Sequence, residues 1–321
     1  MVHKLRNNRF LHPLFVIRDW VMEKSGLFAW KAKIKQKIFF RRLLREDAEK
    51  KRRIDVELMH MPTGLVSGEY TSEDIVISLT SYGKRVTEAL PYALYSLLTQ
   101  TLLPKKIVVY LDKDNWSDNR LPVILRRIKE IGVDFRYCED LRSYKKLIPA
   151  LSDFPDNPIV TVDDDFYYNP MYLEQMMKAY TSSDKKTVLG QWGCIPEKKA
   201  GKFLPYSQWK DCKYGTEESP ISFFGCGGCY YPPHVFDEEI LKKDLFMKMC
   251  PTADDIWFWI MEERLGIKRK YMNQKGYGWN IPVDRIYDYK VTADNCLTTE
   301  NVVNGKNDIQ LRTLLDYYQL D

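Results

Sequence analysis

The stretch Ile159-Val160-Thr161-Val162-Asp163-Asp164-Asp165 decides the fold of this chain, because four β-forming residues run directly into three carboxylates. A short apolar run bounded by polar residues is typical of a buried strand that opens onto a loop. Adjacent carboxylates repel one another, and a shared cation relieves that repulsion. The stretch therefore predicts a strand over 159–162 with a cation at its carboxyl end. A solvated acidic turn is the alternative.

Strands and helices alternate around this stretch. Short apolar runs predict three earlier strands, over 75–80, 106–111 and 133–137. Helical patterns separate the strands, and Asn169-Pro170 is expected to open a further helix as N-cap and first helical residue. Such alternation predicts an α/β fold with a parallel, doubly wound sheet, in which ligands gather at the carboxyl ends of the strands. The intervening helices are predicted over 88–98, 123–130 and 144–151.

The N-terminal segment is strongly basic. Residues 1–53 contain 16 lysines and arginines against 5 acidic residues, a balance of +11, although the whole chain has a net charge of only +5. Within the predicted helical extension 1–60, apolar residues recur at helical spacing among lysines and arginines, as at Trp30, Ile34 and Ile38. This pattern predicts a helix that lies on an anionic membrane surface. A helix packed on the body or on a protein partner is the alternative, and nucleic acid is not an expected partner, because no recognition motif follows.

Targeting signals and cysteines bear on the compartment. No apolar run approaches the ~20 residues that span a bilayer, and no secretory signal is visible. The seven cysteines are therefore expected to be reduced, in a cytoplasmic protein at the inner face of the membrane. Cys226-x-x-Cys229 lacks the second pair that a structural zinc site needs.

Polar residues follow three of the predicted strands and should meet at one edge of the sheet. They are the run Thr80-Ser81-Tyr82-Gly83-Lys84-Arg85, Asp112 with its neighbours, and the carboxylate triplet. Carboxylate oxygens suit Mg²⁺ or Mn²⁺, and Mg²⁺ commonly binds one or two carboxylates together with substrate phosphates. Lys145 or Lys146 could reach a diphosphate as a point charge, or both could lie on a solvated helix face.

A second acidic cluster opens a later helix. Asp254 and Asp255 precede the tryptophan-rich segment Ile256–Trp259 in a helix expected to end near Leu265. Two acids at this place suit a carboxylate that faces a sugar ring, with Asp255 as general base and Asp254 orienting it. They could instead only stabilise the helix N-terminus. Because just four histidines occur, a two-His metal site or a Ser-His-Asp relay is not expected.

These motifs, in this order, resemble the bacterial GT-A-fold glycosyltransferases, family-2-like, that build capsule or O-antigen polysaccharides. The resemblance covers about residues 74–312. It implies a GT-A-type, Rossmann-like sheet flanked by helices. The matching pieces are Ile77–Tyr82 with Arg85, Tyr144–Leu147, Val162–Asp165, Gly225–Gly228 with Tyr231-Pro232-Pro233, Ala253–Asp255 and Asn307–Leu311.

The resemblance also implies roles for individual residues. Asp163 and Asp165 would hold the metal, and Asp255 matches the catalytic base of inverting members. The Gly227-Gly228 turn would border the donor sugar and the acceptor. No histidine follows His234 to complete the metal shell, so Asp294, Asn295, Asn301, Asn307 or water would take that place. Donor binding is expected at Thr80, Ser81, Tyr82, Arg85, Asp112, Lys145, Lys146, Asp163, Asp164, Gly227 and Gly228.

The sequence thus predicts an enzyme that uses Mn²⁺ or Mg²⁺ and a nucleotide-sugar donor, expected to be a UDP-sugar, to glycosylate a glycan acceptor that is expected to be lipid-linked. Residues 74–165 would form the nucleotide-binding half and residues 166–321 the acceptor and catalytic half. Two alternatives stay open. One is a metal-dependent sugar nucleotidyltransferase, and the other is a non-catalytic membrane-surface scaffold of a polysaccharide assembly complex.

Overall fold

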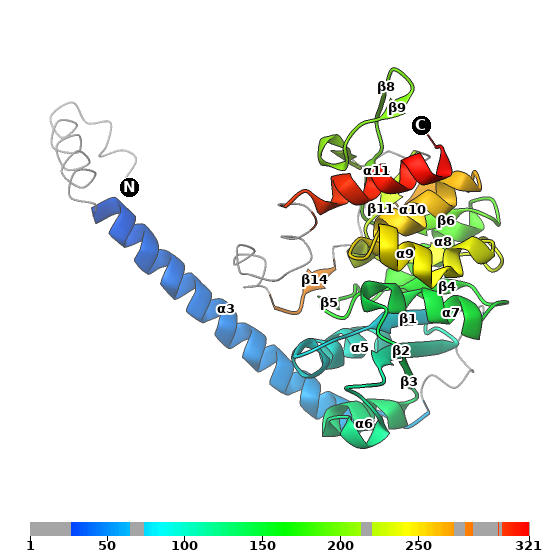
Figure 1. The fold of residues 1–321 in the computed structure, drawn as a ribbon. Coiled ribbons are helices and arrows are strands. Elements are labelled where there is room, and N and C mark those ends of the chain that lie inside the picture. Colours follow the sequence, from blue (N-terminus) through cyan, green and yellow to red (C-terminus); the bar gives the residue numbers. More distant parts are fainter. Residues whose placement is uncertain are drawn as a thin grey trace, which may run out of the picture. The chain divides into compact units, whose positions relative to one another are not determined.

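The computed structural model describes residues 27–64, 74–212, 220–272, 280–284, 301 and 304–320. A seven-stranded sheet with the order β13-β6-β12-β4-β1-β2-β3 forms its centre (Figure 1). Strands β1, β2, β3 and β4 run parallel to one another, and β6 runs parallel to β13. Strand β12 lies between β4 and β6 and is antiparallel to both. The strands span Val76–Thr80 (β1), Lys106–Asp112 (β2), Asp134–Cys138 (β3), Ile159–Thr161 (β4), Val188–Gly190 (β6), Cys229–Tyr231 (β12) and Arg269–Tyr271 (β13).

This sheet confirms the predicted α/β fold, a mostly parallel, Rossmann-like sheet flanked by helices. The four predicted strands match β1 to β4. Strands β1, β2 and β4 are apolar runs buried on both faces, whereas β3 is the edge strand, in which only Phe135 is buried. Three smaller sheets lie outside it. They are β10 (Lys210–Asp211) with β7 (Gly193–Ile195) and β11 (Ser222–Phe223), β14 (Ile281–Pro282) with β5 (Phe166–Tyr167), and β8 (Lys198–Lys199) with β9 (Lys202–Phe203).

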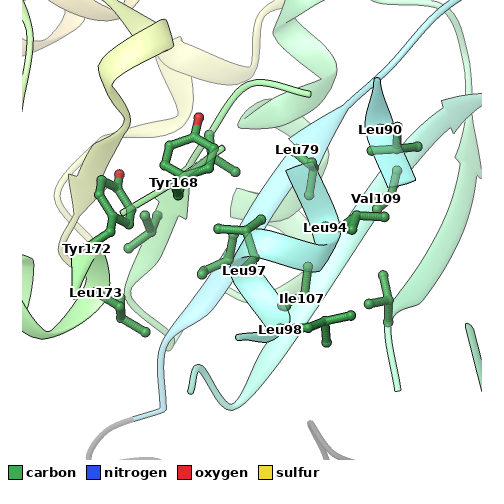
Figure 2. Close-up of a cluster of buried hydrophobic side chains, with 14 of the residues drawn as sticks. Leu79, Leu90, Leu94, Leu97, Leu98, Ile107, Val109, Tyr168, Tyr172 and Leu173 are labelled. Carbon is green, nitrogen blue, oxygen red and sulfur yellow. The ribbon is translucent and has the colours of Figure 1, made fainter. Parts of the chain in front are cut away.

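Two hydrophobic cores lie on the two faces of the sheet. Successive side chains of β2 alternate between them, with Ile107 and Val109 in the first core and Val108 and Tyr110 in the second. Figure 2 shows part of the first core, where leucines of α5 meet Leu79, Ile107 and Val109. Helices α5 (Leu90–Leu98), α6 (Val123–Ile131) and α8 (Tyr172–Thr181) line the first core, and α7 (Ile148–Asp153), α9 (Lys243–Met249), α10 (Asp254–Arg264) and α11 (Lys306–Tyr318) line the second.

Helix α3 (Leu27–His60) belongs to both compact units of the chain, because the division falls between Lys50 and Lys51. Residues 51–60 are part of the body. Ile54 and Leu58 are buried in the first core, and the Lys51 ammonium donates to the Glu88 carbonyl at 2.6 Å. The end of the predicted basic extension therefore contributes to the core of the body.

Residues 27–50 form helix in their own unit. Ion pairs at i,i+4 spacing support it, such as Arg42–Glu46 at 2.7 Å. Trp30 and Ile38 expose more than half of their surface, so the predicted apolar stripe is present among the basic side chains. Among the described residues, no helix combines the length and the apolar character that crossing a bilayer requires.

Three predicted helix boundaries are corrected. The helix expected at Pro170 begins at Tyr172, because Asn169 first forms a turn in which its side chain accepts from the Met171 amide at 2.9 Å. The helix predicted over 144–151 is a 3₁₀ turn over Arg142–Lys146 followed by α7, which starts where Pro149 occupies the first turn. The helix predicted over 88–98 is divided at Ala89 into α4 (Arg85–Glu88) and α5.

Candidate active site

The sheet topology brings the predicted site segments to one edge. Strands β1, β2 and β4 are parallel, so Thr80, Asp112 and Asp163 follow the same ends of the three strands. Because β12 is antiparallel to β4, its first residue Cys229 pairs with Thr161, the last residue of β4. The glycines that precede β12 therefore lie at the edge where the carboxylate triplet lies.

Lys146 joins the two acidic clusters. Its ammonium nitrogen lies 3.2 Å from Asp163 Oδ1, 3.1 Å from Asp254 Oδ2 and 3.9 Å from Asp255 Oδ1. The lysine is buried. Burial opposes its charged form, but the three carboxylates outweigh that effect and raise the pKa of Lys146 well above its usual value. The end of β4 and the start of α10 thus meet at one buried cation.

Asp255 is the more accessible of the two carboxylates at the start of α10. Its side chain retains 33% of its accessible surface, whereas that of Asp254 retains 7%. The Asp255 Oδ1 atom accepts from the Gly225 amide at 3.1 Å. Desolvation and the neighbouring Asp254 charge raise the pKa of Asp255 to about 7, against the influence of Lys146. A partly accessible carboxyl with such a pKa suits proton transfer near neutral pH.

The carboxylate triplet is held by residues that follow β1. Asp164 is buried, accepts a hydrogen bond from the Ser81 hydroxyl and lies 3.3 Å from the Arg85 guanidinium. Burial raises the pKa of Asp164, although Arg85 and Ser81 favour its charged form. Arg85 also pairs with Asp165. The predicted association of the Thr80–Arg85 run with the triplet is therefore present in the structure.

Asp165 has the feature that a metal ligand needs. Its Oδ1 atom is buried and makes no hydrogen bond, while Oδ2 pairs with Arg85. In the described part of the chain, no group of three or more His, Cys, Asp and Glu side chains could hold a metal ion. One or two carboxylates are enough for Mg²⁺ when phosphates and water supply the other ligands. Asp165 and the partly exposed Asp163 thus fit a cation that arrives with a diphosphate.

Other predicted donor-binding residues have local partners. The Thr80 hydroxyl donates to the Tyr110 carbonyl at 2.8 Å, and Asp112 Oδ1 accepts from the Asn115 amide at 2.9 Å. Lys145 is buried in an ion pair with Asp140 and does not join Lys146. Tyr82 is half exposed, with the Arg85 guanidinium 5.5 Å from its ring centroid. Of these residues, Tyr82 presents the most open surface to a ligand.

The glycine-rich loop lies against the acidic cluster. A Cβ atom at Gly225 would collide with the Lys146 ammonium and lie 3.1 Å from Asp255 Oδ1. Gly228 has a φ of +83°, and a Cβ there would collide with the Tyr172 hydroxyl. Glycine at 225 thus leaves space for the Lys146 ammonium, and the positive φ of Gly228 favours glycine there.

The tryptophans of the Ile256–Trp259 segment are core residues. Trp257 and Trp259 do not face a ligand, because both are fully buried in the second core. The Trp257 indole donates to the Ile240 carbonyl at 3.2 Å. Every residue of α10 from Ile256 to Glu262 is buried, which is typical of a helix that is covered on all sides.

A buried network that the sequence reasoning missed holds the turn before α10. The Thr252 amide donates to Gln310 Oε1 at 3.0 Å, and the Thr252 hydroxyl donates to Asn301 Oδ1 at 2.6 Å. The Asn301 amide donates back to the Thr252 carbonyl at 2.6 Å. Asn301, a candidate metal ligand, is thus engaged with Thr252. The signal that pointed to Gln310 was its place in the 307–311 motif.

The remaining candidates for the metal shell divide into two groups. Asn307 is buried at the start of α11, and its Oδ1 atom makes no hydrogen bond. Asp294 and Asn295 lie outside the described residues. The six described cysteines form no disulfide, and Cys296 also lies outside the described part.

No protein-family model matches the chain, and no curated protein is significantly similar to it. Solved structures that match include Staphylococcus aureus TarS with UDP, at 13% identity and a TM-score of 0.42, covering 77% of this chain and 72% of that one. Mycobacterium tuberculosis glucosyl-3-phosphoglycerate synthase with Mn²⁺, UDP and glucosyl-3-phosphoglycerate matches at 10% identity and a TM-score of 0.44, covering 78% of this chain and 81% of that one. CMP:2-keto-3-deoxy-manno-octonic acid synthetase with CTP matches at 10% identity and a TM-score of 0.42, covering 68% of this chain and 96% of that one.

Proposed function

We propose that this protein is a metal-dependent glycosyltransferase that moves a sugar from a nucleotide-sugar donor, a UDP-sugar in the first instance, to a glycan acceptor. One observation carries the proposal. The buried Lys146 ammonium joins Asp163, which ends the donor-side strand, to Asp254 beside the accessible Asp255. Donor-side and base-side carboxylates that meet at one sheet edge are what a single displacement at an anomeric carbon requires.

The residues have separate roles in this proposal. Asp163 and Asp165 hold Mn²⁺ or Mg²⁺, which when bound neutralises charge on the departing nucleoside diphosphate. Asp255 accepts the proton of the acceptor hydroxyl as that oxygen attacks, and the product has inverted configuration. Lys146 holds Asp254 and Asp163 beside each other through its ammonium.

A donor screen tests the proposal. The purified protein is incubated with UDP-, GDP- and CMP-sugars and Mn²⁺ or Mg²⁺, and released nucleotide is measured with and without EDTA. We expect a nucleoside diphosphate to be released with one donor class and EDTA to abolish the release. Asp255→Asn and Asp165→Ala should each lower the rate by at least about a hundredfold.

The matched control is Asp316→Asn, which removes an exposed carboxylate of α11 and should leave the rate unchanged. Normal rates in both site variants would overturn the assignment. Pyrophosphate release from a nucleoside triphosphate and a sugar phosphate would instead identify a nucleotidyltransferase. A protein that binds no nucleotide with either metal would fit the scaffold alternative.

The basic N-terminal segment supports a location for the reaction. We propose that residues 1–53 bind the anionic inner face of the cytoplasmic membrane, which would present a lipid-linked glycan acceptor. The exposed apolar side chains of residues 27–50, among lysines and arginines, support this proposal. Such a helix inserts its apolar face at the headgroup boundary while its cations meet anionic lipid.

A further inference from the structure

An aromatic pair lies at the same sheet edge and has no role in the reaction described above. The rings of Phe166 and Trp192 meet edge to face, with centroids 5.5 Å apart and planes at 87°. Phe166 directly follows the carboxylate triplet, and Trp192 lies two residues beyond the end of β6. Both side chains are partly exposed, and Trp192 belongs to neither hydrophobic core.

The glycine-rich loop holds Trp192 in place. A Cβ atom at Gly227 would lie 2.9 Å from Trp192 Cβ and 3.0 Å from its Cγ, so the indole stem packs directly on the loop backbone. The Phe224 amide donates to the Trp192 carbonyl at 2.8 Å. In the next residue of the same loop, the Gly225 amide donates to Asp255 Oδ1. One short loop therefore ties the tryptophan and the proposed base together.

The strand order places this pair on the side of the carboxylates away from the nucleotide segments. Thr80 and Asp112 end β1 and β2, and β4, β12 and β6 follow in the opposite direction along the sheet. Neighbouring strands lie ~4.8 Å apart, so the end of β6 is ~10 Å beyond the end of β4. Trp192 therefore lies beyond the carboxylates, on the side of β4 opposite to β1 and β2.

We propose that Trp192, supported edge-on by Phe166, forms the subsite that binds the sugar ring of the acceptor through the C–H face of that ring. Aromatic faces provide a large, rigid apolar surface, while nearby polar groups orient the ligand. The proposal rests on the glycosyltransferase function above and adds a residue that selects the acceptor. The indole aligns the ring, and Asp255 receives the proton of its hydroxyl.

Two variants of Trp192 and one control test this subsite. Trp192→Ala should raise the KM for the sugar acceptor by about tenfold or more, which corresponds to ~1.4 kcal/mol of binding. It should change the KM for the donor less than about twofold. Trp192→Phe keeps an aromatic face and should stay within about threefold of the wild type. Tyr317→Ala, which removes an exposed aromatic side chain near the end of α11, is the control and should change neither constant.

A binding measurement makes the subsite testable without turnover. Saturation-transfer NMR with methyl gluco-, galacto- and mannopyranosides, in the presence of UDP and Mn²⁺, should show contact to the ring C–H protons of at least one sugar in the wild type. Trp192→Ala should lose that contact while its circular dichroism and its UDP affinity stay unchanged. If the wild type releases no nucleotide but still shows this sugar contact, the result would count against the proposed function and for the subsite.

Three results would overturn the inference. One is an unchanged acceptor KM in Trp192→Ala, and another is a raised donor KM in its place. The third is equal sugar contact in the wild type and Trp192→Ala, or no contact by the wild type. If Trp192→Ala fails to fold, the comparison is made with Trp192→Leu, which keeps an apolar side chain without the aromatic face.

Discussion

At the scale of single residues, one buried lysine distinguishes this site from a plain acidic turn. Three carboxylates crowd around Lys146, and each alone would be costly to keep charged beside a core. The ammonium offsets their repulsion and joins residues that are about ninety positions apart in the chain. Its neighbour Lys145 pairs with Asp140 instead, because successive residues of the 3₁₀ turn point in different directions.

Removing this cation should cost stability. Lys146→Met should lower the free energy of unfolding by about 3–5 kcal/mol, because it leaves the buried Asp254 carboxylate without its partner. Urea denaturation followed by circular dichroism measures the change. Adding Asp254→Asn to Lys146→Met should recover part of the loss. Lys210→Gln, which breaks an exposed pair with Glu197, should cost under about 1 kcal/mol, and an equal cost in both lysine variants would contradict the assignment.

The raised pKa of Asp255 predicts a pH profile. A base acts only when it is deprotonated, so kcat/KM for sugar transfer should rise with pH up to about 7 and then level off. Below that pH the rate should fall by about tenfold per unit. Steady-state kinetics between pH 5 and 9 would check this profile. A flat profile across that range, with transfer still dependent on Asp255, would exclude its role as the base.

At the scale of elements, the start of α10 is held by α11. The two helices pack together (Figure 1), and Gln310 of α11 accepts from both the amide and the hydroxyl of Thr252. Thr252 comes just before Asp254 and Asp255. A helix more than fifty residues later in the chain therefore positions the start of α10, where the proposed base lies. Sequence patterns predicted α10 but neither α11 nor this contact, because nothing in a single helix records its partner.

Gln310→Ala should therefore loosen the base without touching a substrate. We expect kcat to fall by about tenfold with little change in the donor KM, because misplacement of a catalytic group lowers the chemical step. The unpaired Thr252 amide should also cost about 1–3 kcal/mol of unfolding free energy. Thr313→Ala, on the exposed side of the same helix, is the control and should change neither quantity. An unchanged kcat in Gln310→Ala would remove α11 from this role.

At the scale of the whole molecule, the chain divides into a large body and a basic N-terminal unit. The division falls between Lys50 and Lys51, inside one continuous helix. Ile54 and Leu58 belong to the core of the body, so a truncation that extends to residue 60 would open that core. A deletion that ends at Lys50 keeps the contact between Lys51 and the Glu88 carbonyl.

Deletion of residues 1–50 should release the protein from vesicles that contain 30% phosphatidylserine, while donor turnover with a soluble acceptor survives. Co-sedimentation at low and high salt measures the binding, which salt should weaken. Replacing Lys33, Lys35, Lys37 and Arg41 with Gln should act in the same direction as the deletion. The same change at Lys198, Lys199, Lys202 and Lys210 is the control, and unchanged vesicle binding after the deletion would exclude the membrane role.

The sequence by itself determined the first four strands, the helical segments between them and the two acidic clusters, because alternating apolar runs and runs of carboxylates are local patterns. Only the tertiary structure decided that Lys146 joins the clusters, that Trp257 and Trp259 are core residues, and that Trp192 meets Phe166 at the same sheet edge. The reason is physical. Which side of a buried helix meets the site, and which distant residue completes an ion pair, depends on how elements pack, and neither leaves a periodic trace in the chain.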